Sequence, residues 1–122
     1  MKRTGKIPGP DPAVLSAAFV LVFRQGRSPP SCPTPNDMDL LNRICDAVPA
    51  ASPVVCREAL VRVRRLSFDA AEAGSAFLDG EYGTGDGAKD AAVADLGKKN
   101  PGFSEPEYRT AFAVGLMWAG LP

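Results

Sequence analysis

Residues 100–121 read Asn-Pro-Gly-Phe-Ser-Glu-Pro-Glu-Tyr-Arg-Thr-Ala-Phe-Ala-Val-Gly-Leu-Met-Trp-Ala-Gly-Leu and mark both ends of one helix. Ser104 and Glu107 have the spacing of a capping box, in which each side chain accepts a hydrogen bond from the other residue's backbone N–H. Phe103 precedes this cap, where it can pack on the tyrosine of the second turn. Gly120 offers a left-handed stop. The stretch therefore predicts a helix that begins after Ser104 and ends just before Gly120.

Apolar side chains surround most of this helix, and no charged residue follows Arg109. A helix that is apolar on all sides is usually buried, and this run is shorter than the roughly 20 residues that cross a bilayer. We therefore expect it at the centre of the domain, partly covered by the first helix of the chain. The alternative is that its apolar surface near Trp118 meets a partner or a second copy. The apolar residues are Tyr108, Phe112, Val114, Leu116, Met117 and Trp118.

The composition indicates a small helical domain. The chain has 122 residues with 12 Gly and 12 Pro, which break it into short elements, and alternating patterns typical of strands are nearly absent. We predict an all-α fold, a single small domain of about five short helices in an irregular bundle, with a Pro-rich linker after the first helix. The formal net charge is zero, so the chain as a whole has no electrostatic preference for nucleic acid or anionic membranes.

The sequence contains no histidine, which excludes Ser-His-Asp and Cys-His nucleophiles and every metal site that uses histidine. Its three cysteines lack CxxC spacing, and an odd number is not typical of a secreted disulfide scaffold. Reduced thiols and a cytoplasmic location are therefore expected. Cys45 and Cys56 fall on neighbouring predicted helices and can meet, and the sequence leaves open whether they pair.

Residues 1–35 are predicted to form a basic N-terminal tail, a first helix and a Pro-rich linker, ahead of a helical core at 36–122. Asp11 and Pro12 have the order of a cap and a first helical residue, so a buried helix is expected over about 12–25. Basic residues before its apolar run also imitate a signal peptide, so an export signal or a membrane-surface anchor is the alternative. The prolines at 28–35 predict an extended linker that would let the first helix dock loosely.

The core is expected to hold four further helices before the C-terminal one. Each has apolar residues at helical spacing and a polar residue where a cap is needed. The expected helices and caps are about 37–48 with Thr34 or Asn36, 53–66 with Ser52, 68–79 with Ser67, and 88–99 with Asp86.

Four arginines on the predicted helix 53–66 form the candidate partner-binding surface, because guanidinium groups bind carboxylates and phosphates through paired hydrogen bonds. They are Arg57, Arg62, Arg64 and Arg65. An alternative interpretation is a solvated face, since Glu58 lies four residues before Arg62 and cations near a helix C-terminus are stabilising without any partner.

The segment 80–87, Gly-Glu-Tyr-Gly-Thr-Gly-Asp-Gly, precedes a predicted helix and so invites comparison with phosphate-binding loops. It matches neither the P-loop nor the dinucleotide pattern. A calcium site built from Asp79, Glu81, Asp86 and Asp90 lacks the ligand order of an EF-hand. We interpret the segment as a flexible connector, with ligand binding left open.

These features favour a small cytoplasmic, non-enzymatic helical protein of regulatory or adaptor type that acts by protein–protein interaction. The partner-binding residues would be Arg57, Arg62, Arg64, Arg65 and Trp118, and self-association is a further option. No catalytic residue, metal or cofactor is predicted. One alternative is a small nucleic-acid-binding regulator that uses the same arginines. The other is a histidine-free enzyme that relies on Asp79, Glu81 or Asp86, or on Cys56.

Overall fold

The computed structural model describes residues 11–26 and 37–120, and all regular structure in these ranges is helical. The prediction of an all-α bundle of about five helices is confirmed. The first helix continues without a break into a wider π-helical segment, η1. The elements are α1 (Pro12–Phe19), η1 (Val20–Gly26), α2 (Asp37–Ala47), α3 (Pro53–Leu78), α4 (Gly87–Lys99) and α5 (Glu105–Trp118).

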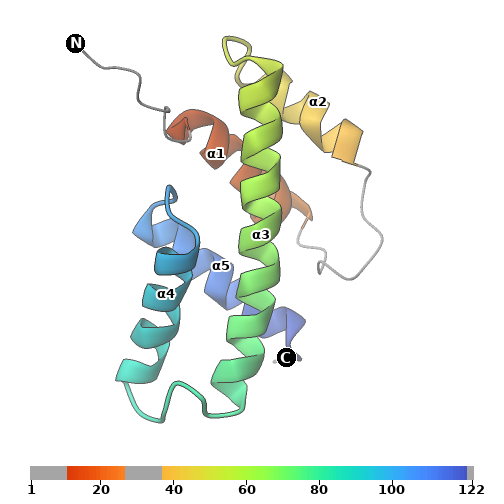
Figure 1. The fold of residues 1–122 in the computed structure, drawn as a ribbon. Helices are drawn as coiled ribbons and strands as arrows, with labels where there is room; N and C mark the ends of the chain where they lie inside the picture. Colours follow the sequence, from red (N-terminus) through yellow and green to blue (C-terminus); the bar gives the residue numbers. More distant parts are fainter. Residues whose placement is uncertain (1–10, 27–36, 121–122) are drawn as a thin grey trace, which may run out of the picture.

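Helix α3 is the central element of the bundle, and every other helix packs against it. Figure 1 shows α3 along the full height of the molecule, with α1 and α2 beside its N-terminal half and α4 beside its C-terminal half. The expectation that α5 would be central is wrong. The reason is length: α3 has 26 residues and α5 has 14, so only α3 is long enough to reach all the others.

The predicted helices 53–66 and 68–79 are one continuous helix, so the prediction of a break at Ser67 is wrong. Ser67 is buried inside α3, and its hydroxyl donates a 2.7 Å hydrogen bond to the carbonyl oxygen of Arg64 instead of capping a new helix. Serine does this readily within a helix. The apolar face also passes through this point, since Val63 and Leu66 before it and Ala70 after it are all buried.

The capping box that begins α5 is present as predicted. The Ser104 backbone N–H donates to the Glu107 carboxylate at 2.9 Å, and the Glu107 N–H donates to the Ser104 hydroxyl at 3.3 Å. The Phe103 ring packs edge-on against Tyr108 with ring centroids 6.1 Å apart. Gly120 ends the helix with a φ of +109°, the left-handed stop that the sequence indicated.

The other predicted caps have mixed outcomes. Asp11 accepts a hydrogen bond from the Ala13 N–H at the start of α1, and Ser52 accepts one from Val55 at the start of α3. Asp86 does precede α4, but its side chain forms no capping hydrogen bond, so that prediction is wrong in its mechanism. Thr34 and Asn36, together with the tail and the Pro-rich linker 28–35, lie outside the described residues.

Helices α3 and α5 cross in direct backbone contact. A Cβ atom on Gly115 of α5 would overlap the carbonyl oxygen of Ala70, and one on Gly74 of α3 would lie 2.5 Å from the Gly115 oxygen. The two glycines therefore allow a spacing that no side chain would permit.

The first helix is joined to the core by aromatic side chains. Phe19 and Phe23 are fully buried and stack on each other with centroids 4.7 Å apart, and Phe23 also packs on Trp118 of α5 at 5.7 Å. The serine at position 16 adds a 2.9 Å hydrogen bond from its hydroxyl to Glu107. Across the described ranges, no helix combines the length and apolar character that a membrane crossing would need.

Candidate functional site

The four predicted arginines all lie on α3, but the helix divides them between two hollows on either side of Val61. Arg57 and Arg64 line a groove between α2 and α3 of about 440 Å³. Arg62 and Arg65 line a smaller hollow of about 240 Å³ beside the turn that joins α4 and α5. The groove is largely apolar, and its remaining lining residues are Met38, Leu41, Leu60 and Val61.

The arginines differ in how their charges are satisfied. Arg62 forms an ion pair with Glu58 at 3.1 Å, which is the pairing that its spacing indicated. Arg64 is half-buried, whereas Arg57 and Arg65 are exposed. Within the described parts of the chain, Arg57 and Arg65 form no hydrogen bond or ion pair. These two guanidinium groups are therefore available to an external anion.

Large apolar side chains next to these arginines are exposed to solvent. Val54, Val61 and Phe68 are spaced seven residues apart on α3, and their exposed fractions are 69%, 57% and 57%. Residues at this spacing lie almost in line along a helix. Exposed apolar side chains aligned on one face make this part of α3 a candidate contact surface.

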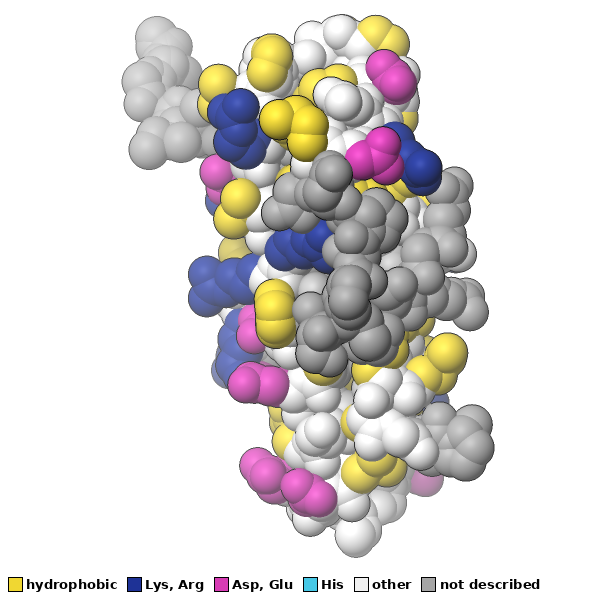
Figure 2. Space-filling model, turned by 90° about the vertical axis from the view of Figure 1, so that its right-hand side faces the viewer, with side chains coloured by type: hydrophobic (Ala, Val, Ile, Leu, Met, Phe, Trp, Pro, Cys, Tyr) yellow, Lys and Arg dark blue, Asp and Glu magenta, His cyan; other side chains and the backbone are white. Residues whose placement is uncertain are grey.

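The same face of α3 changes its charge along its length. We define the α3 stripe as the exposed residues that recur every three or four positions, and they begin with cations and end with carboxylates. Along the left-hand edge of the molecule in Figure 2, dark-blue Lys and Arg side chains lie in the upper and middle parts, interspersed with some magenta ones, whereas the lowest part carries only magenta Asp and Glu side chains. The stripe consists of Val54, Arg57, Val61, Arg65, Phe68, Glu72, Ser75 and Asp79.

Trp118, the fifth predicted site residue, is not brought together with the arginines. It is half-buried, packs on Phe23, and lines neither of the two arginine hollows. The side chain beside it, Met117, is half-exposed. The structure thus places Trp118 apart from the arginines, as a separate candidate surface.

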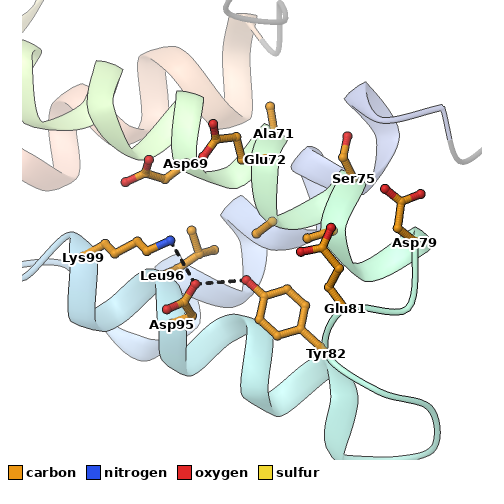
Figure 3. Close-up of a pocket in the computed structure, with 12 residues that line it drawn as sticks. Asp69, Ala71, Glu72, Ser75, Asp79, Glu81, Tyr82, Asp95, Leu96 and Lys99 are labelled. Atoms are coloured by element: carbon orange, nitrogen blue, oxygen red, sulfur yellow. Dashed lines mark hydrogen bonds and ion pairs between the residues drawn. The ribbon is translucent and has the colours of Figure 1, made fainter.

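A third hollow, of about 620 Å³, lies between the C-terminal half of α3 and α4, and we call it the acidic hollow because five of its twelve lining residues are Asp or Glu. In Figure 3, Tyr82 and Lys99 point toward Asp95, while Asp69 and Glu72 project from α3 on the opposite side. The Tyr82 hydroxyl donates to Asp95 Oδ2 at 3.0 Å, and Lys99 Nζ lies 3.2 Å from the same oxygen.

The groups in this acidic hollow modify one another's protonation. Burial, together with the hydrogen bond to Asp95, raises the pKa of Tyr82 to about 12. Burial opposes the ionisation of Asp95, but hydrogen bonds from Lys99 and Tyr82 outweigh it and hold the pKa of this carboxyl below its usual value. The bond to Asp95 in turn raises the pKa of Lys99. The trio is a stable charged cluster at neutral pH, with no group poised to exchange a proton there.

The acidic residues do not assemble into a metal site. In the described ranges, no three acidic or cysteine side chains are arranged to hold a metal ion. The candidate calcium set is dispersed: Asp79 and Glu81 line the acidic hollow, whereas Asp86 does not, and Asp90 pairs with Arg109 at 3.2 Å.

The two cysteines that the sequence placed on neighbouring helices do meet. The Cys45 and Cys56 thiols lie within hydrogen-bonding reach, and they form no disulfide. Burial, reinforced by the neighbouring Cys45 thiol, raises the pKa of Cys56 to about 11. Cys56 is therefore a protonated, fully buried thiol at neutral pH, the opposite of an activated nucleophile.

Sequence reasoning missed the acidic half of the α3 stripe and the Tyr82–Asp95–Lys99 cluster. The stripe could have been found, because its spacing and charges are visible once residues 53–78 are taken as one helix. The cluster could not, because it depends on how the segment 80–87 folds back on α4. Comparison with family models, curated proteins and solved structures finds no match for this chain.

Proposed function

We propose that this protein is a small non-enzymatic interaction protein, of regulatory or adaptor type, that binds another protein through the N-terminal half of the α3 stripe. The observation that carries the proposal is the combination of two exposed arginines, Arg57 and Arg65, with the exposed side chains of Val54, Val61 and Phe68. Among the residues that the structure describes, neither arginine has a hydrogen-bond or ion-pair partner. Arginine next to apolar surface is the composition enriched at protein interfaces.

The groove between α2 and α3 supports the same proposal. It is about 440 Å³ in volume, and it places Arg57 and Arg64 over the apolar side chains of Met38 and Val61. An amphipathic helix with acidic residues on its flank fits such a groove, because its apolar face can enter while its carboxylates meet the guanidinium groups. A cytoplasmic location belongs to the proposal, because three cysteines without CxxC spacing are not typical of a secreted disulfide scaffold.

The test removes the three arginine side chains that line or border the stripe. In the variant Arg57→Ala/Arg64→Ala/Arg65→Ala we expect the partner to be lost. The helical circular dichroism should be retained, because none of the three side chains is fully buried and alanine favours a helix. The measurement is affinity purification of the tagged protein from a sample divided into two halves, of which one is treated with nuclease and the other is left untreated. Electrostatic contacts at a hot spot predict at least about a tenfold loss of affinity.

The matched control removes three cations elsewhere, in the variant Arg43→Ala/Lys89→Ala/Lys98→Ala, and it should keep the partner. A partner retained by both variants would contradict the proposal. If binding is lost on nuclease treatment, the nucleic-acid alternative replaces it. That alternative has less support, because Glu72 and Asp79 on the same stripe would repel phosphates.

A further inference from the structure

We infer that the partner of the α3 stripe is a second copy of this chain, bound antiparallel across a two-fold axis that passes beside Phe68. This inference rests on the proposed function, because it names the occupant of the same surface. It is carried by the order of charges along the stripe. When a second copy of the stripe is turned end to end, its carboxylates face the cations of the first copy and its cations face the carboxylates.

The stripe forms one straight row on α3. Its intervals of three and four residues average close to the 3.6 residues of a helical turn, so the row stays on one side of the helix over about 38 Å. All eight residues are exposed. The same helix of a second copy can therefore lie along most of this row.

Charge decides the direction of that partner helix. The stripe places Arg57 and Arg65 before Phe68 and places Glu72 and Asp79 after it. Parallel pairing of two copies would set arginine against arginine and carboxylate against carboxylate. Antiparallel pairing sets each cation against a carboxylate, and the two-fold axis produces every such pair twice.

The register follows from the distances along the helix. Arg57 lies eleven residues before Phe68 and Asp79 lies eleven residues after it, so both are about 16 Å from the axis and face each other across it. Arg65 lies three residues before Phe68 and Glu72 lies four residues after it. Arg65 of one copy and Glu72 of the other therefore lie within about 1.5 Å of the same position along the helix axis. Phe68 then meets Phe68 of the second copy, a contact favoured between exposed aromatic rings.

On α3, charged side chains outside the stripe are already paired within the chain. Glu58 is paired with Arg62, and Asp69 accepts a 2.9 Å hydrogen bond from the Asn100 amide. By contrast, Arg57, Arg65, Glu72 and Asp79 form no ion pair or hydrogen bond within the described ranges. Along α3 and its C-cap, the charged side chains left for an intermolecular contact are therefore the four whose positions match across the two-fold axis.

Disulfide trapping tests the register and the direction together. In the full chain carrying Cys32→Ser, we expect Phe68→Cys to form a covalent dimer under mild oxidation, because the two residues meet at the axis. The control is Val54→Cys, which is at least as exposed but lies fourteen residues from the axis, so the two copies of residue 54 would be about 42 Å apart. Equal trapping of both variants would indicate parallel or random pairing and would overturn the inference.

Charge reversal tests the same pairing without cysteines. Sedimentation equilibrium of the natural chain should show a mass rising toward twice 12.8 kDa with concentration. Arg57→Asp and Asp79→Arg should each weaken dimerisation at least about fivefold, and the double variant should recover most of the loss, because the pair is restored with its signs exchanged. Two weak single variants whose effects simply add would contradict the pairing.

Failure of this inference differs from failure of the proposed function. A chain that stays monomeric and gives no preferential trapping at residue 68, but loses a heterologous partner when the arginines are removed, would overturn the dimer and leave the proposed function standing. A chain whose self-association and partners are both unaffected by the arginine variant would overturn both.

Discussion

Gly115 is the residue at which α5 comes nearest to α3. We expect Gly115→Ala to lower the free energy of unfolding by at least about 2 kcal/mol, because the added methyl group overlaps the backbone of Ala70 and the helices must separate. Chemical denaturation followed by circular dichroism measures this. The matched control is Gly87→Ala, where an added Cβ has no neighbour within 4 Å and φ is not positive. A loss equal to that of the control would contradict the close crossing.

Cys56 and Tyr82 make the free energy of unfolding depend on pH in the alkaline range. Their pKa values are raised on folding, from 9.0 to about 11 and from 10.0 to about 12, so the folded state holds these protons more tightly than the unfolded state. Their contribution is complete below pH 9 and is lost as the pH rises through 11 to 12. We therefore expect the free energy of unfolding to fall over this range.

The measurement is the urea midpoint at several pH values between 8 and about 11.5, because both shifts act within that range. Cys56→Ala and Tyr82→Phe should each flatten part of the decline, and Tyr82→Phe should also remove the late-titrating tyrosine absorbance. Identical slopes for the natural chain and both variants would show that the two groups ionise as freely in the folded protein as in the unfolded chain.

Some residue contacts could be predicted and others could not. The contact between Phe103 and Tyr108 followed from their place around a cap, because residues a few positions apart at a helix start have little choice of neighbour. The bond from Tyr82 to Asp95 did not, because it spans a connector whose path has no short-range signal.

At the scale of the elements, α5 owes its start to the capping box. We expect Ser104→Ala to lower the free energy of unfolding by about 1 kcal/mol, because the Glu107 N–H loses its hydrogen-bond acceptor at a helix end. Thermal unfolding by calorimetry measures this, with Thr84→Ala in the exposed connector as the control. A Ser104→Ala variant as stable as the control would mean that water replaces the cap without loss.

Helix ends were predicted well where proline or a capping side chain marked them, as at Pro12, Pro53 and Ser104. The prediction failed at Ser67, because serine can cap a helix or bond back within one, and its own neighbours do not decide between the two. Burial against α5 favours the continuous helix there, and α5 is far away in the sequence.

At the scale of the whole molecule, the zero net charge conceals a separation of charge along α3. The composition excluded an overall preference for nucleic acid, but it could not show that cations and carboxylates occupy opposite ends of one exposed row. This separation becomes visible only when α3 is known to be continuous and to have one side uncovered by α1, α2, α4 and α5 (Figure 1). The candidate surface was therefore half predicted: its arginines were named, and its apolar row and acidic half were not.

The sequence by itself determined that this chain is helical and where most of its helices begin and end, because caps, prolines and apolar periodicity act within a few residues. It also determined the arginine cluster, since those residues lie within three turns of one another. Only the tertiary structure decided that α3 is one helix at the centre, that Gly74 and Gly115 let α5 cross it in contact, and that Trp118 packs on Phe23 and lines neither arginine hollow. These features depend on the packing of segments distant in sequence, and short-range signals carry no information about which helix covers which face.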